Sequence, residues 1–396
     1  MDGTNSNQQE SCKQHKHKKR RIECDIGVAD RISELPDEII YIILSFLTLR
    51  EAAATSLLSH RWSDLWKHTS NLDFVDTTNR HHNMETTEIE HDSWDVETCK
   101  HVKMVNSVLE SHQALFLKEF RIQFYINSSA QSTITKWLKF VWSRQVERLD
   151  LKFICYSPKH TVVLGDLVGE MRPMKHLKTL SLRSLKVSGE DISLFLRNCP
   201  LLRELNIEAS TLTSDVHLVS MQDRGNYGSR YIKLHFASAV SCITSQLQKL
   251  ILSLALYPKK LLLGGFPEMP NLKELVVKDS SLYEHGCLLP LTSAISACPC
   301  LQEFMFEFLD SVENAAPNVE RCPHQRLEML KFQGSCATDI IKSVTYISDC
   351  CDAFQKIKTC TPLMSKADVQ AHRDHMHHLQ LELSHQVQLK FFKIID

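Results

Sequence analysis

A short apolar pattern recurs along most of the chain and limits the folds that the chain can adopt. Eight segments fit Leu-x-x-Leu-x-Leu, with other apolar residues allowed at the Leu positions, and they begin at residues 117, 146, 177, 202, 247, 272, 301 and 327. Successive starts are 29, 31, 25, 45, 25, 29 and 26 residues apart. One strand and one returning segment, repeated at such a period, build a stack in which each unit contacts only its neighbours. The pattern therefore predicts an elongated α/β stack with a parallel sheet, and not a sandwich or a doubly wound sheet.

The repeats are uneven in length, although a proline recurs shortly before five of them. A proline precedes five of the repeat starts by two to four residues, at positions 173, 200, 270, 299 and 323, where it would end the returning segment. Residues 190–199 place Ile192, Phe195 and Leu196 on one side and are expected to form a helix between strands. The interval of 45 residues is either an insertion or a degenerate repeat around "RYIKLHF" at residues 230–236.

Regular leucine-rich repeats carry Asn or Cys at the ninth position, where the side chain links neighbouring turns. The eight segments instead hold Tyr125, Ile154, Leu185, Ser210, Ala255, Ser280, Leu309 and Ser335 there. We therefore expect an irregular leucine-rich-repeat solenoid, with rungs of unequal shape.

Residues 34–47, "ELPDEIIYIILSFL", predict a short helix that is apolar on nearly every side. Pro36 suits the first helical position, and Asp37 and Glu38 oppose the positive end of the helix dipole. The helix is too short to cross a bilayer, which needs about 20 residues. One face carries Ile39, Ile42, Ile43 and Phe46, and another carries Ile40, Leu44 and Leu47. A small helical block covers only one of these faces, so the other is expected to be covered by a partner protein or by the repeats.

Two further helices are expected directly after this one. The residues "TLRE" form a capping box, in which Thr48 and Glu51 each bond the backbone N–H of the other, so a helix should run over residues 49–58. A third helix is expected over residues 59–68, with Trp62, Leu65 and Trp66 on one face. The polar residues 76–97 are interpreted as a linker, and the polar, basic residues 1–28 as a disordered tail.

The bulk composition argues against several classes of protein. The chain has 46 basic and 47 acidic residues and a net charge of −1, so a nucleic-acid partner is not expected. No apolar run is long enough for a membrane span, and the first residues do not resemble a secretory signal. The 14 cysteines include no C-x-x-C pair and are expected to be reduced thiols.

The sequence offers no motif for catalysis or for a cofactor. It lacks G-x-S-x-G, H-E-x-x-H, a P-loop and G-x-G-x-x-G, so we expect a protein that is not an enzyme. One histidine cluster, His372, His375, His377 and His378, lies in a polar segment, and solvation is preferred there over metal binding. We expect no metal and no cofactor.

Residues 30–68, "DRISELPDEIIYIILSFLTLREAAATSLLSHRWSDLWKH", resemble the plant F-box. The matching elements are the D-R-I-S-x-L-P-D opening, the I-L-S-F-L helix end, the T-S-x-L-S segment and the R-W-x-x-L-W close. Residues 101–124 and 134–151 resemble the helix and first strands of plant F-box proteins with leucine-rich repeats. Residues 323–335, "PHQRLEMLKFQGS", resemble the start of the FBD-type C-terminal domain of the same group. Two features depart from the group: Thr48 replaces the usual proline after Phe46-Leu47, and the last fifty residues match poorly apart from a possible closing strand, "LSHQVQLKFFKI".

The resemblance and the patterns together predict the organisation of the chain. A disordered basic tail (1–28) precedes a small three-helix F-box (29–75), a linker (76–97), degenerate leucine-rich repeats (98–345) and a divergent or truncated FBD-like region (346–396). Within the tail, Lys16, Lys18, Lys19, Arg20 and Arg21 are either a nuclear-localisation signal or a solvated basic run. We expect the protein in the nucleus, the cytoplasm or both.

The resemblance implies a substrate-recruiting subunit of an SCF-type E3 ubiquitin ligase. The F-box would bind a Skp-class adaptor and, through it, the cullin-RING ligase, and the repeats would bind a protein substrate. Adaptor contacts carried over by position are Leu35, Pro36, Ile39, Ile43, Leu47, Leu58 and Trp62, each of which could instead pack within the F-box, Trp62 above all. Substrate candidates on the sheet face are Arg183, Asn206, Glu208, Ile251, Val276, Lys278, Met305 and Glu307. Two alternatives stay open: a receptor for a small molecule or hormone, and a nuclear scaffold without ubiquitin transfer.

Overall fold

The structure is a computed structural model of the whole chain. It describes residues 32, 34–75, 91–126, 128–154, 162–164, 172–187, 189–212, 230–233, 245–254, 259–262, 266, 268–278, 294–307, 324–333, 356–361, 377 and 388–393. The basic tail, most of the region after residue 333 and the histidine cluster apart from His377 lie outside the described residues, so the predictions made for them remain predictions.

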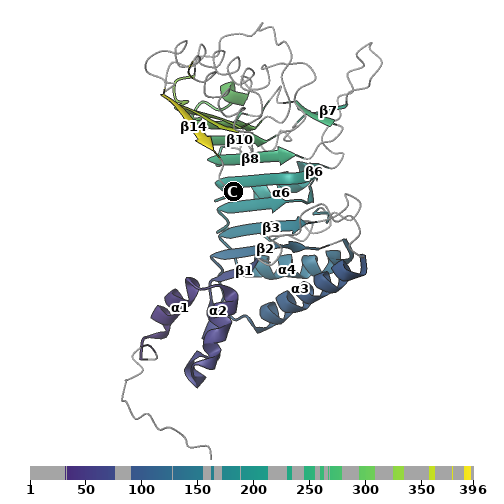
Figure 1. The fold of residues 1–396 in the computed structure, drawn as a ribbon, viewed down its shortest axis with the longest axis vertical. Coiled ribbons are helices and arrows are strands. Elements are labelled where there is room, and N and C mark those ends of the chain that lie inside the picture. Colours follow the sequence, from purple (N-terminus) through teal and green to yellow (C-terminus); the bar gives the residue numbers. More distant parts are fainter. Residues whose placement is uncertain are drawn as a thin grey trace, which may run out of the picture.

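The described part of the chain begins with a small helical block (Figure 1). Helix α1 spans Asp37–Ser45 with Pro36 at its N-cap, and α2 spans Leu49–Ala54. The predicted capping box is present: the Glu51 N–H donates to Thr48 Oγ1 at 3.3 Å, and the Thr48 N–H donates to Glu51 Oε2 at 2.9 Å. The reciprocal bonds satisfy two backbone N–H groups at the start of α2, so this helix can begin directly after α1 with almost no loop.

The expected second and third α-helices are shorter than predicted and continue as 3₁₀ turns. These are η1 (Thr55–Leu57), η2 (His60–Trp62) and η3 (Leu65–His68). Thr55 Oγ1 donates to the Ala52 carbonyl and Ser63 Oγ to the His60 carbonyl, and such local bonds compete with a continuous α-helix. Ser59 is fully extended, at φ −162° and ψ 169°, and separates η1 from η2.

A long parallel sheet follows the helical block and confirms the predicted α/β solenoid. The 12-stranded sheet has the order β1-β2-β3-β4-β6-β8-β10-β11-β12-β13-β14, with β5 paired to β6. Its strands are β1 (Asn71–Val75), β2 (Glu119–Tyr125), β3 (Arg148–Ile154), β4 (Thr179–Arg183), β5 (Lys186–Val187), β6 (Glu204–Leu212), β8 (Lys249–Leu254), β10 (Glu274–Lys278), β11 (Glu303–Glu307), β12 (Met329–Gln333), β13 (Lys356–Thr361) and β14 (Gln388–Lys393). Figure 1 shows these strands as the rungs of one elongated stack.

All eight predicted segments contribute a strand to this sheet, in one shared register. The fourth position of each segment pairs with the fourth position of the next, and every one of these side chains is buried: Phe120, Leu149, Leu180, Leu205, Leu250, Leu275, Phe304 and Leu330. The apolar period of the sequence is therefore the inner face of the sheet.

Helices cover the inner face of the sheet at its N-terminal end. They are α3 (His91–Ser111), α4 (Gln131–Ser143, preceded by η5, Ser128–Ala130) and α6 (Gly189–Asn198). The α6 prediction is confirmed, since Ile192, Phe195 and Leu196 are all buried in the main core. The linker boundary is wrong, because α3 begins at His91, inside the range predicted to be unstructured.

The interval of 45 residues is an insertion and does not contain a rung of the main sheet. Strand β6 pairs directly with β8 across it. Strand β7 (Arg230–Lys233), which covers the start of "RYIKLHF", pairs instead with β9 (Lys259–Leu262) in a separate two-stranded sheet. At the C-terminal end, β14 confirms the closing strand predicted within "LSHQVQLKFFKI".

The helical block is joined tightly to the first rungs of the sheet. Strand β1, which the sequence analysis did not predict, pairs in parallel with β2. The loop before β2 bonds back to the end of the block: the Gln113 N–H donates to the Lys67 carbonyl and the Lys118 N–H to the Ser70 carbonyl, both at 2.8 Å. His112 Nε2 lies 2.9 Å from the Thr69 carbonyl oxygen, with the histidine side chain buried.

The buried His112 should make stability depend on pH. Its pKa is lowered, first because burial disfavours the imidazolium and further because Arg144 and His68 are positively charged neighbours, although the Thr69 carbonyl opposes this. A lowered pKa in the folded state means that the unfolded chain binds more protons below the ordinary pKa of about 6.5. The stabilising contribution is therefore complete above about pH 6.5 and is lost as the pH falls through the folded pKa.

We expect the unfolding free energy of the native chain to fall more steeply between about pH 7.5 and about pH 5.5 than that of His112→Gln, which retains an N–H donor but does not titrate. Denaturant unfolding at several pH values measures both slopes, and the difference removes the effect of the other histidines. Parallel slopes would contradict the prediction.

Candidate functional site

Helix α1 divides its apolar side chains between the interior and the surface. Ile40 and Leu44 are fully buried in a small core with Ala52, Trp62 and Leu65. On the other side, Ile39 and Ile43 are 42% and 37% exposed, and Ile42 is more exposed than either. The division agrees with the helical spacing, and it leaves one aliphatic face of α1 without cover from the described residues.

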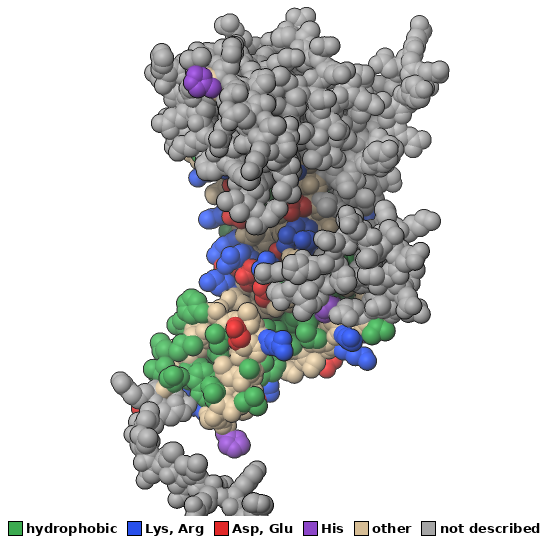
Figure 2. Space-filling view, in the orientation of Figure 1, with side chains coloured by type: hydrophobic (Ala, Val, Ile, Leu, Met, Phe, Trp, Pro, Cys, Tyr) green, Lys and Arg blue, Asp and Glu red, His purple; other side chains and the backbone are tan. Residues whose placement is uncertain are grey.

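The uncovered face of α1 continues onto its neighbours. Phe46, just after α1, is 84% exposed, and Leu57 in η1 is 88% exposed, with Leu58 beside it also exposed. We call these six residues, Ile39, Ile42, Ile43, Phe46, Leu57 and Leu58, the apolar patch. Figure 2 shows hydrophobic side chains gathered over the helical block, whereas charged side chains mark the sheet above it. Large apolar side chains concentrated in this way mark a protein-binding surface.

An arginine holds the start of α1 against the turn η2. Arg61 Nη2 donates to Asp37 Oδ1 at 2.8 Å and also to the backbone carbonyl of Leu35. Both charged groups are substantially exposed, so the ion pair itself contributes little, but the two bonds set the direction in which the chain enters α1. The sequence analysis did not single out Arg61; its position as the first residue of the R-W-x-x-L-W element was the available signal.

The structure separates the seven predicted adaptor contacts into two groups. Pro36, Ile39, Ile43 and Leu58 are exposed on the surface. Leu35 and Leu47 are partly buried against the small core, and Trp62 is 3% exposed and belongs to that core. Trp62 is therefore a packing residue, because its indole fills the space between α1 and the 3₁₀ turns. Ile42, Phe46 and Leu57 were not predicted as contacts, although Ile42 and Phe46 share the helical face of Ile39.

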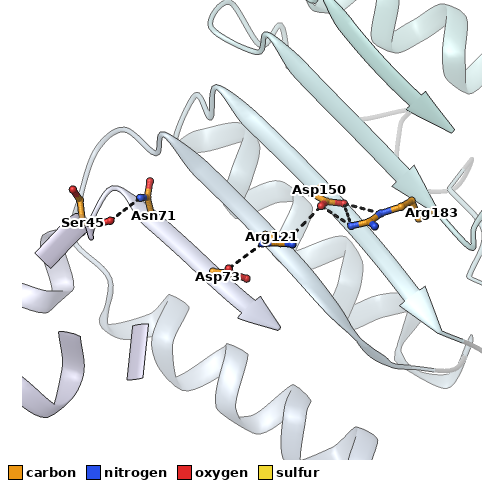
Figure 3. A network of polar contacts seen from close by, with 6 residues as sticks. All are labelled: Ser45, Asn71, Asp73, Arg121, Asp150 and Arg183. Atoms are coloured by element: carbon orange, nitrogen blue, oxygen red, sulfur yellow. Dashed lines mark hydrogen bonds and ion pairs between the residues drawn. The ribbon is translucent and has the colours of Figure 1, made fainter. Parts of the chain in front are cut away.

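The outward face of the first strands carries a chain of alternating charges (Figure 3). Asp73 Oδ2 lies 3.3 Å from Arg121 Nη1, and Asp150 Oδ2 lies 3.6 Å from Arg121 Nε and 2.7 Å from Arg183 Nη2. These four residues stand on the consecutive strands β1, β2, β3 and β4. Asn71 Nδ2 donates to the Ser45 carbonyl at 3.2 Å, which ties the end of α1 to the same edge. The charges neutralise each other pairwise across the strands.

Burial affects two charged groups on this face. Partial burial raises the pKa of Asp73, although Arg121 opposes the rise. The pKa of Lys152 is lowered by burial and then by the neighbouring Arg183. Lys152 stands beside Arg183 in the strand register, so the two positive charges lie on adjacent strands. The outward face is thus partly desolvated, which disfavours the charged forms of these two groups.

The eight predicted substrate residues lie along the sheet but are not all free to bind. Arg183 is bonded to Asp150, and Lys278 Nζ lies 3.0 Å from Glu208 Oε1, so these three charged groups are already paired. Val276 is only 5% exposed, which corrects its prediction as a surface contact. The remaining candidates are Asn206, Ile251 and Met305, which are partly exposed, and Glu307, whose side chain lies outside the described residues. Their role in substrate binding stays a prediction.

The described residues give little support for a reactive thiol, a metal site or a membrane-spanning helix. Burial raises the pKa of both Cys199 and Cys298 to about 12, so these thiols stay protonated and are poor nucleophiles. Over the same part of the chain, no three His, Cys, Asp or Glu side chains are grouped to hold a metal ion. None of the helices described there has the length and hydropathy that a bilayer crossing requires.

Comparison with known proteins identifies the helical block. The model of the F-box domain family matches residues 32–74, which span α1, α2, the 3₁₀ turns and most of β1. Residues 32–74 are an F-box domain. The apolar patch therefore lies on the F-box, and β1, the first rung of the sheet, begins within the F-box match.

The curated relatives are named for the same domain, and two of the three described here also for leucine-rich repeats. A putative F-box/LRR-repeat protein of Arabidopsis thaliana is 29% identical over 204 residues, which is 46% of this chain and 39% of that protein. An F-box/FBD/LRR-repeat protein of the same plant is 32% identical over 196 residues, or 44% of this chain and 40% of that protein. A putative FBD-associated F-box protein is 29% identical over 196 residues, or 44% of this chain and 42% of that protein.

These matches confirm the predicted resemblance to plant F-box/leucine-rich-repeat proteins of the FBD-type group. The aligned region spans about two-fifths of the length of these relatives. The identity of the partners and of any substrate is not carried by this similarity.

Proposed function

We propose that the chain is the substrate-recruiting subunit of an SCF-type ubiquitin ligase, whose F-box binds a Skp-class adaptor. One observation supports this most directly: the F-box match coincides with the surface where six apolar side chains are exposed together. Leaving Phe46 and Leu57 in water is unfavourable, and binding an apolar groove on a partner would remove that cost.

The architecture suits a recruiting subunit. The F-box is bonded to the first rungs through Lys67, Ser70 and Thr69, so a partner on the F-box and a substrate on the sheet would keep a constant separation. The role needs no catalytic group in this chain, because ubiquitin transfer would take place on other subunits. The receptor alternative has no observation of its own among the described residues.

The proposal is tested by mixing the full-length chain with a purified Skp-class adaptor. We expect a one-to-one complex in size-exclusion chromatography with light scattering, and addition of a cullin-RING pair should enlarge it. A chain that is folded by circular dichroism but passes the column separately from the adaptor at micromolar concentrations would refute the proposed function.

We also propose that the basic run of the tail directs import into the nucleus. Lys16, Lys18, Lys19, Arg20 and Arg21 lie outside the described residues, so the support is the sequence pattern alone. Changing Lys18, Lys19, Arg20 and Arg21 together to alanine should move a fluorescent full-length fusion from the nucleus to the cytoplasm. An unchanged distribution under the microscope would identify the run as a solvated tail.

A further inference from the structure

The loop before β2 exposes two large apolar side chains next to each other. Leu115 is 72% exposed and Phe116 is 63% exposed, whereas the next residue, Leu117, is buried in the main core. Leu117 is the first residue of the first repeat segment, so it anchors the loop. The two residues before it point outward from an anchored position.

The repeat fold does not require apolar residues at these two positions. The corresponding pairs in the other seven repeats are Arg144-Gln145, Lys175-His176, Pro200-Leu201, Ser245-Gln246, Pro270-Asn271, Pro299-Cys300 and Gln325-Arg326. Each pair precedes the same strand position, and apart from Leu201 and Cys300 these residues are polar, charged or proline. Two large apolar side chains exposed side by side are thus special to the first repeat among these eight, since Leu201 has only Pro200 beside it. The first repeat is the one that adjoins the F-box.

The loop is attached directly to the end of the F-box. Its Gln113 N–H bonds the Lys67 carbonyl, and its Lys118 N–H bonds the Ser70 carbonyl, so backbone contacts on both sides of the apolar pair reach the segment 67–70. The exposed end of α1 adjoins the same edge, because Asn71 Nδ2 of β1 bonds the Ser45 carbonyl, one residue before Phe46. Leu115 and Phe116 therefore stand beside the F-box, at the strand-start edge of the sheet.

Phe116 is partly ordered before any partner binds. Its ring contacts the His176 ring edge-to-face, with the ring centroids 6.2 Å apart and an interplanar angle of 79°. His176 belongs to the equivalent loop two strands along, before β4. An exposed aromatic side chain that is already held in place loses less entropy on binding, which is typical of residues that dominate an interface.

We propose that the adaptor contacts Leu115 and Phe116 as well as the F-box, so that the first repeat contributes a second part of the adaptor-binding surface. This inference rests on the proposed function above. The adaptor is favoured as the occupant because, among the eight repeat segments, the pair of large apolar side chains occurs only in the repeat bonded to the F-box. In addition, the loop lies at the edge of the sheet, not on the outward face that carries the chain of alternating charges. Contact at both places would also fix the direction in which the repeats extend from the ligase.

The test compares one double variant and one single-residue control variant of the full-length chain in titration with a purified Skp-class adaptor. Leu115→Ser with Phe116→Ser should raise the dissociation constant by roughly tenfold to a hundredfold, since both side chains would leave a buried contact. The matched control is Leu201→Ser, which removes the exposed leucine at the equivalent position before β6 and should leave the dissociation constant unchanged. Thermal unfolding of each variant checks that these exposed substitutions leave the fold intact.

Each result separates the inference from the proposed function. If the native chain binds the adaptor and the Leu115/Phe116 variant binds equally well, the inference is wrong and the proposed function stands. If Leu201→Ser weakens binding to the same extent, the effect is not specific to the first repeat, and the inference is again wrong. If the variant changes only self-association, measured by sedimentation, then the pair binds a second copy of this chain. If the native chain fails to bind the adaptor at all, the proposed function fails first.

Discussion

Replacing Ile39 and Ile43 together by alanine is expected to weaken adaptor binding by more than a hundredfold. Both side chains lie on the uncovered face of α1, one turn apart, with Ile42 and Phe46 around them. A contact at the centre of an apolar interface can cost about 2 kcal/mol or more per truncated side chain, and the part of each isoleucine now in water would be buried in the complex. A combined loss of about 3 kcal/mol corresponds to a little over a hundredfold in the dissociation constant.

Titration calorimetry with the purified adaptor would measure this change, and thermal unfolding would show whether the variant stays folded. A matched control is available on α3, where Val96 and Met104 are also exposed aliphatic side chains on a helix outside the F-box. Val96→Ala with Met104→Ala should bind the adaptor as tightly as the native chain. Equal binding by the Ile39/Ile43 variant would show that the adaptor uses another face of the F-box.

The repeats were predictable because the physical cause of their pattern is local. Each rung buries the first and fourth residues of its segment, and also the sixth in the six rungs where that side chain is described. Neighbouring rungs must do so at nearly the same place, so an apolar residue recurs at fixed positions. Phe120, Leu149 and Leu180 show the result, since they are register partners on adjacent strands and all are buried. A pattern of this kind appears in the sequence even when the spacing between repeats varies.

Strand β1 was not predictable in the same way. Its five residues, Asn71–Val75, precede a polar segment, and its pairing partner β2 begins at Glu119, far along the chain. Its stability comes from that pairing and from burial of Leu72 and Phe74 against the main core, neither of which is visible in a five-residue window. The start of α3 at His91 was missed for a similar reason, because the first residues of that helix are polar.

Helical spacing alone predicted the residues of the candidate site but not which face of α1 is buried. The resemblance to the F-box supplied that orientation, with Ile39 and Ile43 outward, and the burial of Ile40 and Leu44 confirms it. Spacing along α1 separates Ile39 and Ile43 from Ile40 and Leu44, but both faces are equally apolar in sequence. Which one is buried depends on where Trp62 and its neighbours in the 3₁₀ turns pack, and that is a tertiary property. Trp62 illustrates the limit: its residue type suits an interface as well as a core, and only its burial distinguishes them.

The ion pairs on the outward face of the sheet are a second feature that the sequence pattern did not predict. Arg183 and Glu208 were chosen as substrate contacts because their positions were expected to alternate with buried residues. Both side chains are partly exposed, although the alternation is interrupted in β4, where Ser181 is buried. Their ion pairs with Asp150 and Lys278 could not be read from the pattern, since the partners lie on neighbouring strands or two strands away. A substrate would have to compete with these pairs or bind between them.

Replacing Ile40 and Leu44 together by alanine is expected to unfold the F-box while the repeats stay folded. Both side chains are fully buried, and the small core contains three other buried residues, Ala52, Trp62 and Leu65. Truncating a buried Ile or Leu to Ala costs about 2–5 kcal/mol, so the pair should cost about 4–10 kcal/mol. A core of this size has little stability to lose, and it forms a cluster separate from the main core of the sheet. The loss should therefore be local, and the repeats should retain their own cooperative transition.

Hydrogen exchange followed by mass spectrometry separates this outcome from the effect of the exposed pair. In the Ile40/Leu44 variant, amides of α1, α2 and the 3₁₀ turns should exchange rapidly, and those of β2, β3 and β4 should stay protected. In the Ile39→Ala, Ile43→Ala variant, the same F-box amides should remain protected although adaptor binding is lost. Adaptor binding should also be lost in the Ile40/Leu44 variant, but because the surface that presents Ile39 and Phe46 no longer exists. Protected F-box amides in the Ile40/Leu44 variant would contradict this prediction. They would mean that burial of Ile40 and Leu44 does not hold α1 in place, and that the 3₁₀ turns around Trp62 stabilise the F-box instead.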